Sequence, residues 1–194
     1  SDTKTIYLDS AAPTGTIKNS SGTAISGYTG GAFSYTATDT GSGVSYLQYK
    51  TPGSSSWTTY SSGTTISASA TNGLYQFRAV DNAGNTSAVS SIYLDTAIPT
   101  GKITDSNGTT VTTTTNKAFK YTASDGLSGI AYMQYKKPNS TVWETYAAGT
   151  LIQTTDTNGI YRFRAFDNAG NESETVMICL DTVKPTGTLY GGTS

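Results

Sequence analysis

The sequence predicts an all-β protein made of two tandem antiparallel β-sandwiches joined end to end. Three observations support this prediction. The chain repeats itself internally, its apolar residues alternate with polar ones over short segments, and Gly, Asn, Pro and Ser separate these segments. A length of 194 residues allows one or two domains of ordinary size.

The internal repeat sets the predicted domain boundaries. The segment Ile6-Tyr7-Leu8-Asp9 returns at Ile92 and, with Cys179 in place of Tyr, at Ile178, so the period is 86 residues (92 − 6 and 178 − 92). A period of this length is that of a whole small domain. We therefore expect the end of a preceding repeat or a linker at 1–9, repeats at 10–95 and 96–181, and the start of a following repeat or a tail at 182–194.

Each repeat divides into short strands. In the first repeat Phe33, Tyr35 and Ala37 alternate with polar residues, which is the period of a half-buried strand. Further strands are predicted at 44–50, 57–60, 64–66, 74–80 and 89–94. About seven strands in a repeat, with turn residues at short spacing, are typical of an immunoglobulin or fibronectin type III sandwich.

Two features of the strand predicted at 74–80 refine this fold. Tyr75 follows the turn Asn72-Gly73 and predicts a tyrosine corner, in which its hydroxyl bonds to the backbone upstream. Phe77 stands where an antibody domain has its second Cys. Because Cys179 is the one cysteine of the chain, no internal disulfide can form.

Composition excludes several classes of function. Lys and Arg number 12 and Asp and Glu number 13, so the net charge of −1 gives no basis for binding nucleic acid. No apolar run is long enough to insert into a membrane. His is absent, which excludes the Ser-His-Asp triad and His-ligated metals. We expect that the chain is not an enzyme and has no catalytic residues.

The residues 77–85 (Phe-Arg-Ala-Val-Asp-Asn-Ala-Gly-Asn), followed by 92–100, resemble the bacterial Ig-like repeat domains of surface proteins and large adhesins. The resemblance covers both repeats. It implies a bacterial protein that is secreted or attached to the cell wall. It also implies that neighbouring Ig-like repeats of the same chain are its partners, and a host or cell-wall glycan or a protein receptor is a further candidate.

Two interpretations apply to the Asp-Asn-Ala-Gly-Asn segments at 81–85 and 167–171. They can be simple turns, because Asp and Asn bond to nearby backbone amides. Alternatively they contribute to calcium sites, because in this fold two loops and the incoming linker meet at one end, and some repeats of the resembled family hold calcium at their junctions. The candidate calcium ligands are Asp9, Asp39, Asp81, Asn82 and Asn85, and then Asp95, Asp125, Asp167, Asn168 and Asn171.

Strand alternation also predicts an outward face. If Leu47, Tyr75, Phe77, Ile92 and Leu94 are in the core, polar and aromatic neighbours on the same strands point outward. These side chains form a candidate glycan-binding face, although they can equally be cross-strand pairs that only stabilise the sheet. The candidate residues are Tyr46, Gln48 and Arg78, with Tyr132, Gln134 and Arg164 in the second repeat.

The predicted function is a non-catalytic structural or adhesion module of an extracellular protein. The linker Asp95-Thr96-Ala97-Ile98-Pro99 is short, and its Pro restricts the backbone, so the repeats should form a semi-rigid spacer. The alternative is a carbohydrate-binding accessory module of a secreted glycosidase or an adhesin. No cofactor is required by either function, apart from the calcium considered above.

Overall fold

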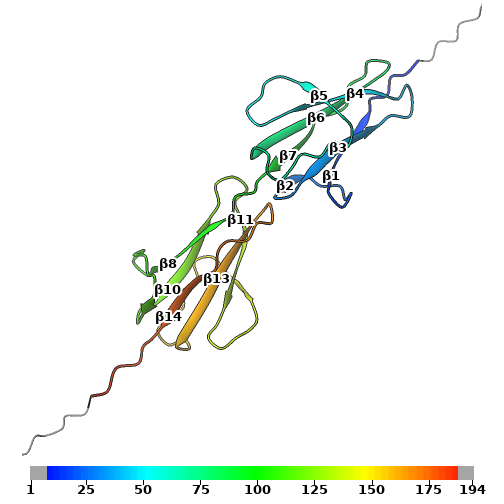
Figure 1. The fold of residues 1–194 in the computed structure, drawn as a ribbon. Helices are drawn as coiled ribbons and strands as arrows, with labels where there is room; N and C mark the ends of the chain where they lie inside the picture. Colours follow the sequence, from blue (N-terminus) through cyan, green and yellow to red (C-terminus); the bar gives the residue numbers. More distant parts are fainter. Residues whose placement is uncertain (1–7, 188–194) are drawn as a thin grey trace, which may run out of the picture. The chain divides into compact units, whose positions relative to one another are not determined.

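The computed structural model describes residues 8–187 and shows an all-β fold (Figure 1). Strands are the only regular elements in this part of the chain, and none of its segments is a helix that could span a membrane. Two compact units are present. The first extends to Ile98 and includes the loops Asp125–Gly129 and Asp167–Asn171, and the second contains the rest. The segments predicted to belong to adjacent repeats are 1–9 and 182–194. Residues 1–7 of the first and 188–194 of the second lie outside the described residues.

The first unit is a sandwich of a two-stranded and a five-stranded sheet. Strands β1 (Thr14–Asn19) and β3 (Phe33–Thr38) pair in the smaller sheet. The larger sheet has the order β2-β7-β6-β4-β5. Its members are β2 (Gly27–Thr29), β4 (Val44–Lys50), β5 (Thr58–Tyr60), β6 (Gly73–Asp81) and β7 (Ser90–Leu94). The pairing is antiparallel except between β2 and β7, which are parallel.

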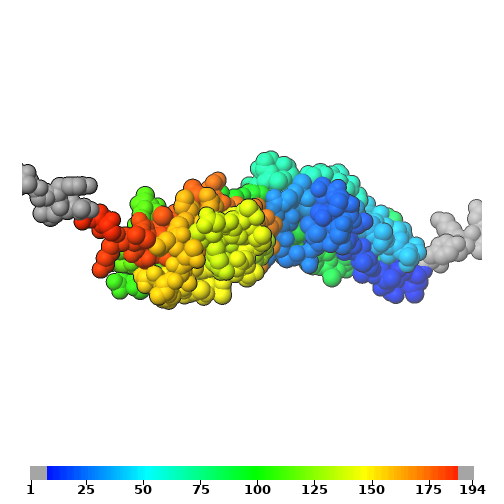
Figure 2. Space-filling view, turned by 90° about the horizontal axis from the view of Figure 1, so that it is seen from below, coloured from blue at the N-terminus to red at the C-terminus, as the bar shows by residue number. Residues whose placement is uncertain are grey.

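The second unit has the same topology. Strands β8 (Thr100–Asp105) and β10 (Phe119–Ser124) form the small sheet, and the large sheet has the order β12-β11-β13-β14-β9. Its strands are β9 (Thr114–Thr115), β11 (Ile130–Lys136), β12 (Glu144–Tyr146), β13 (Gly159–Asp167) and β14 (Val176–Leu180). The segment around 140–155, yellow in the space-filling view, covers much of the face that this unit turns to the viewer (Figure 2).

Each sandwich encloses an aromatic core, as the alternation predicts. Phe77 and Ala79 are fully buried, and Tyr75 is 3% exposed. The Phe77 ring stacks on Tyr35 with a centroid separation of 5.0 Å, and Phe163 stacks on Tyr121 at 5.1 Å. An aromatic side chain therefore fills the position that a disulfide occupies in antibody domains.

Tyrosine hydroxyls fasten the strands of both cores. The predicted tyrosine corner is confirmed, since Tyr75 Oη donates to Thr71 O at 3.0 Å and Tyr161 Oη to Thr157 O at 2.9 Å. A second pair of bonds was not predicted. The backbone N–H of Tyr121 donates to Tyr146 Oη at 3.0 Å, and this hydroxyl donates onward to the Thr150 carbonyl.

Candidate metal centre and outward face

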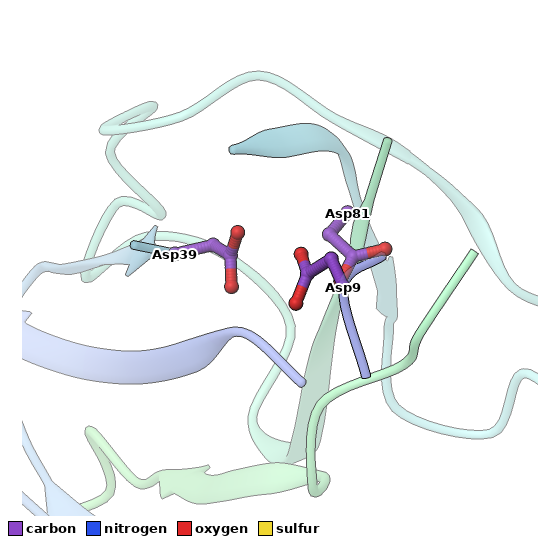
Figure 3. Close-up of side chains that lie close together, drawn as sticks. All are labelled: Asp9, Asp39 and Asp81. Atoms are coloured by element: carbon purple, nitrogen blue, oxygen red, sulfur yellow. The ribbon is translucent and has the colours of Figure 1, made fainter. Parts of the chain in front are cut away.

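Three carboxylates meet at one end of the first sandwich. Asp9 precedes β1, Asp39 follows β3 and Asp81 ends β6, and one oxygen of each lies within 4.8 Å of the other two (Figure 3). The structure thus brings together side chains from three segments that are far apart in the sequence. This is the proximity that the strand order predicts, and we call this group the first carboxylate trio.

A second carboxylate trio recurs 86 residues later. Asp95, Asp125 and Asp167 each offer an oxygen within 4.8 Å of the others. Asp95 is fully buried and Asp167 is 2% exposed, so this trio is better shielded from water than most surface acids. The repetition shows that the arrangement is a property of the repeat.

The loops after β3 and β10 hold one carboxylate of each trio through backbone N–H groups. Gly41 N and Gly43 N donate to Asp39 Oδ1 at 3.1 and 2.7 Å. Asp125 Oδ1 accepts from Leu127, Ser128 and Gly129 N at 2.9–3.0 Å. Burial acts to raise the pKa of Asp125, but these hydrogen bonds outweigh it and the net shift is downward.

The acid that precedes each repeat is fastened to the same loop. Ser42 N donates to Asp9 Oδ2 at 2.6 Å and Ala11 N to Asp9 Oδ1 at 3.0 Å. Hydrogen bonds from Ser42, followed by that from Ala11, lower the pKa of Asp9. In the second repeat Ser128 N donates to Asp95 Oδ2 at 2.9 Å. Sequence reasoning missed Ser42 and Ser128, although both follow the loop Asp by three residues.

The four asparagines predicted as calcium ligands connect the loops through their amide nitrogens. Asn82 Nδ2 donates to Ser42 O at 2.8 Å, and Asn168 Nδ2 to Ser128 O at 2.7 Å. Asn85 Nδ2 donates to both Asp9 O and Asp81 Oδ2. Its counterpart Asn171 does the same with Asp95 O and Asp167 Oδ2, each at 2.8 Å. These amides hold the acids in place around the trio.

The electrostatics of the two trios suit a cation. The two ion pairs found within residues 8–187 join Lys137 to Glu144 and Arg164 to Glu172, so neither of them neutralises a carboxylate of the trios. Asp39 Oδ2 accepts no hydrogen bond from this part of the chain. Carboxylate oxygens of this kind on adaptable loops are the ligands that Ca²⁺ prefers, and a bound cation would offset their mutual repulsion.

The predicted glycan face lies on the outer side of the five-stranded sheets. Tyr46 and Tyr132 are 46% and 48% exposed. Arg78 Nε donates to Gln48 Oε1 at 2.9 Å, and Arg164 Nε donates to Gln134 Oε1 at the same distance. Each repeat therefore has three of the six residues on its outward surface, and in each repeat the Arg is hydrogen-bonded to the Gln.

Two tryptophans that sequence reasoning did not assign to this face also lie on it. The Arg78 guanidinium sits 4.4 Å from the Trp57 ring centroid, and the Lys50 ammonium 4.8 Å from it. In the second repeat the Arg164 guanidinium lies 4.2 Å from the Trp143 ring centroid and 5.0 Å from that of Phe166. On each face, cationic side chains thus lie next to aromatic rings, and we call this arrangement the cationic and aromatic ladder.

The comparisons with known proteins give little information about function. No model of a protein family matches the sequence, and no curated protein matches it. Among the solved structures that are similar to this chain is one described as fibronectin(III)-like modules of Clostridium thermocellum CbhA. It has 18% sequence identity and a TM-score of 0.39, and the match covers 90% of this chain and 100% of that one. A likeness at this level says nothing about activity or ligands.

Proposed function

We propose that the chain is a non-catalytic structural or adhesion module of an extracellular bacterial protein, in which consecutive repeats form a semi-rigid spacer. One observation carries the proposal. Asp9 and Asp95 each precede a repeat, and each accepts a backbone N–H from that repeat's first loop, from Ser42 and Ser128 respectively. A segment fastened in this way has fewer conformations than a free linker, which is what a spacer needs.

Small-angle X-ray scattering of the full chain tests the spacer function. We expect the wild-type profile to fit a narrow range of conformations. Asp95→Ala removes an acceptor for Ser128 N and should broaden that range, while Glu174→Gln, at an exposed acid that belongs to neither trio, should leave it unchanged. A wild-type profile typical of two freely tumbling domains would contradict the proposal.

The proposal includes calcium binding by both carboxylate trios. Each trio supplies three carboxylates, and main-chain carbonyls or water would complete the six to eight oxygen ligands of Ca²⁺. A ligand that binds only the folded state raises stability by about 2.7 kcal/mol at a concentration of 100 Kd. Calcium should therefore shift the melting temperature of the chain upward relative to a chelator.

The variant Asp39→Asn tests whether the first carboxylate trio binds calcium or is part of a simple turn. The substitution can keep the oxygen that Gly41 and Gly43 bond, and it replaces only Oδ2, so the loop should keep its shape. In chelator the variant should be as stable as wild type or more so, because one of three like charges is gone. In calcium its shift should be smaller than that of wild type. Identical wild-type melting curves in calcium and in chelator would show that the trios are only turns.

The second candidate function is a carbohydrate-binding accessory module of a secreted glycosidase or an adhesin. The position of Trp57 and Trp143 on the predicted glycan face favours it, because sugar rings stack on indole. A glycan array should then give hits that Trp57→Ala and Trp143→Ala remove together. An array without any hit would indicate that the cationic and aromatic ladder only stabilises the sheet.

A further inference from the structure

A polar groove of about 510 Å³ opens on the second unit, between the turn after β11 and the start of β13. Its volume lies in the range of small-molecule sites. The groove contains no member of the carboxylate trios or of the predicted glycan face. Its polar lining is formed by Asn139, Ser140, Thr141, Asn158 and Arg162.

The two repeats differ at this groove in a way that costs backbone strain. At an offset of 86 residues Asn139 replaces Gly53, and Arg162 replaces Gln76. Gly53 has φ +77° and Asn139 has φ +62°, so the turn keeps a left-handed backbone that glycine adopts with the least strain. Asn139 is the one non-glycine residue with positive φ in the described part of the chain. The second repeat thus places an amide side chain here at a conformational cost.

Apart from the Ser140 hydroxyl, which donates to Val142 O, the polar side chains of the groove have groups available to a ligand. Arg162 is half-buried on β13 and takes part in neither ion pair found between residues 8 and 187. Asn158 Oδ1 accepts from Thr182 N and Oγ1, both at 3.1 Å, which fixes the amide and leaves its nitrogen without an acceptor in that range. The site therefore combines one guanidinium with the amide of Asn158, which is already oriented, and the amide of Asn139.

We propose that this groove binds a carboxylate-bearing saccharide, such as a uronic acid unit. The Arg162 guanidinium matches a carboxylate with two parallel N–H donors. The amides of Asn139 and Asn158 and the hydroxyl of Thr141 match sugar hydroxyls, which both donate and accept hydrogen bonds. This proposal does not depend on the spacer function, because it concerns the second repeat alone.

Calorimetric titration of the full chain tests the proposal with three probes: a galacturonate oligosaccharide, a neutral galactose oligosaccharide of the same length, and inorganic phosphate. We expect the galacturonate to bind at least about tenfold more tightly than the neutral sugar, as one charge-assisted bidentate pair would give. Inorganic phosphate should not compete with it.

The first repeat supplies the matched variants. Arg162→Gln and Asn139→Gly install residues with which the first repeat forms the same turn and strand, so both variants should fold. Arg162→Gln should weaken galacturonate binding at least about tenfold. Asn139→Gly should also weaken it while the melting temperature stays equal or rises. The double variant Gly53→Asn/Gln76→Arg should add a second binding event.

Several results would overturn the proposal. They are the absence of galacturonate binding at millimolar concentration, equal binding of the neutral sugar, tighter binding of phosphate, and unchanged binding by Arg162→Gln. In each case the spacer function could still hold, because its scattering and calcium measurements do not involve this groove.

Discussion

Two tyrosines of the second core show how much the surroundings of a single hydroxyl matter. Tyr161 Oη donates to Thr157 O, whereas the buried Tyr121 Oη finds no hydrogen-bond partner in the described part of the chain. The nearby Ser173 hydroxyl donates its one proton to Glu174 O and accepts from Ala165 N, so it offers no proton to Tyr121 Oη. The same side chain is therefore satisfied at one position and an unpaired polar group at the other.

Removing these hydroxyls should have unequal effects. Tyr161→Phe loses a hydrogen bond and leaves the Thr157 carbonyl without this donor, which should lower the free energy of unfolding by about 1–2 kcal/mol. Tyr121→Phe removes a buried hydroxyl that makes no bond, so stability should be unchanged or slightly higher. Urea denaturation of both variants measures the difference. Equal losses would mean that Tyr121 has a partner in solution.

At the scale of strands, the sequence predicts those elements whose apolar residues alternate. The predicted 44–50 coincides with β4, and the predicted 74–80 lies within β6. Strands β1 and β2 were missed, because Ile17 is the single buried residue of β1 and β2 has only three residues. The strand predicted at 64–66 is wrong, since that segment makes a single bridge, from Ile66 to Phe33. Parallel pairing of β2 with β7 was not expected either.

The sequence predicted only part of the candidate site. The loops that carry Asp39 and Asp81 lie at one end in any sandwich of this topology, so the meeting of the acids follows from strand order. The roles of Ser42 and Gly43 depend on their backbone N–H groups, which the identity of a side chain does not reveal. Trp57 precedes a three-residue edge strand, where alternation is too short to indicate a face.

The cationic and aromatic ladder on the second sheet yields a test at this scale. Arg164 bonds Gln134, pairs with Glu172 and lies over two aromatic rings. Arg164→Lys keeps the charge but loses the planar fork, and should lower the free energy of unfolding by about 1 kcal/mol. Lys137→Gln, which breaks an exposed ion pair, is the control and should have almost no effect. Equal effects in both variants would contradict the stacking role.

Across the whole molecule, buried phenols make stability depend on alkaline pH. Burial raises the pKa of six tyrosines, three in each core: Tyr35, Tyr60, Tyr75, Tyr121, Tyr146 and Tyr161. An unfolded tyrosine has a pKa of about 10 and then loses its proton before the folded one does. The stabilising contribution is therefore complete below about pH 10 and is lost as pH rises through the folded pKa values.

We accordingly expect the melting temperature to be nearly constant from neutral pH to about pH 10 and to fall steeply above it. Tyrosinate absorbance should rise in two steps, with the six buried phenols ionising only as circular dichroism reports unfolding. The chain has 14 tyrosines, so the remaining ones serve as an internal reference. Ionisation of all 14 near pH 10 in a folded chain would contradict the prediction.

The stacking of Phe77 on Tyr35 and of Phe163 on Tyr121 has a further consequence. Neither interior depends on an oxidised sulfur bridge, and the lone thiol of Cys179 is free. Reducing agents at any strength should therefore leave both sandwiches intact. The polypeptide should also reach its native state without oxidative folding catalysts, so that the redox state of its surroundings has no control over when it matures.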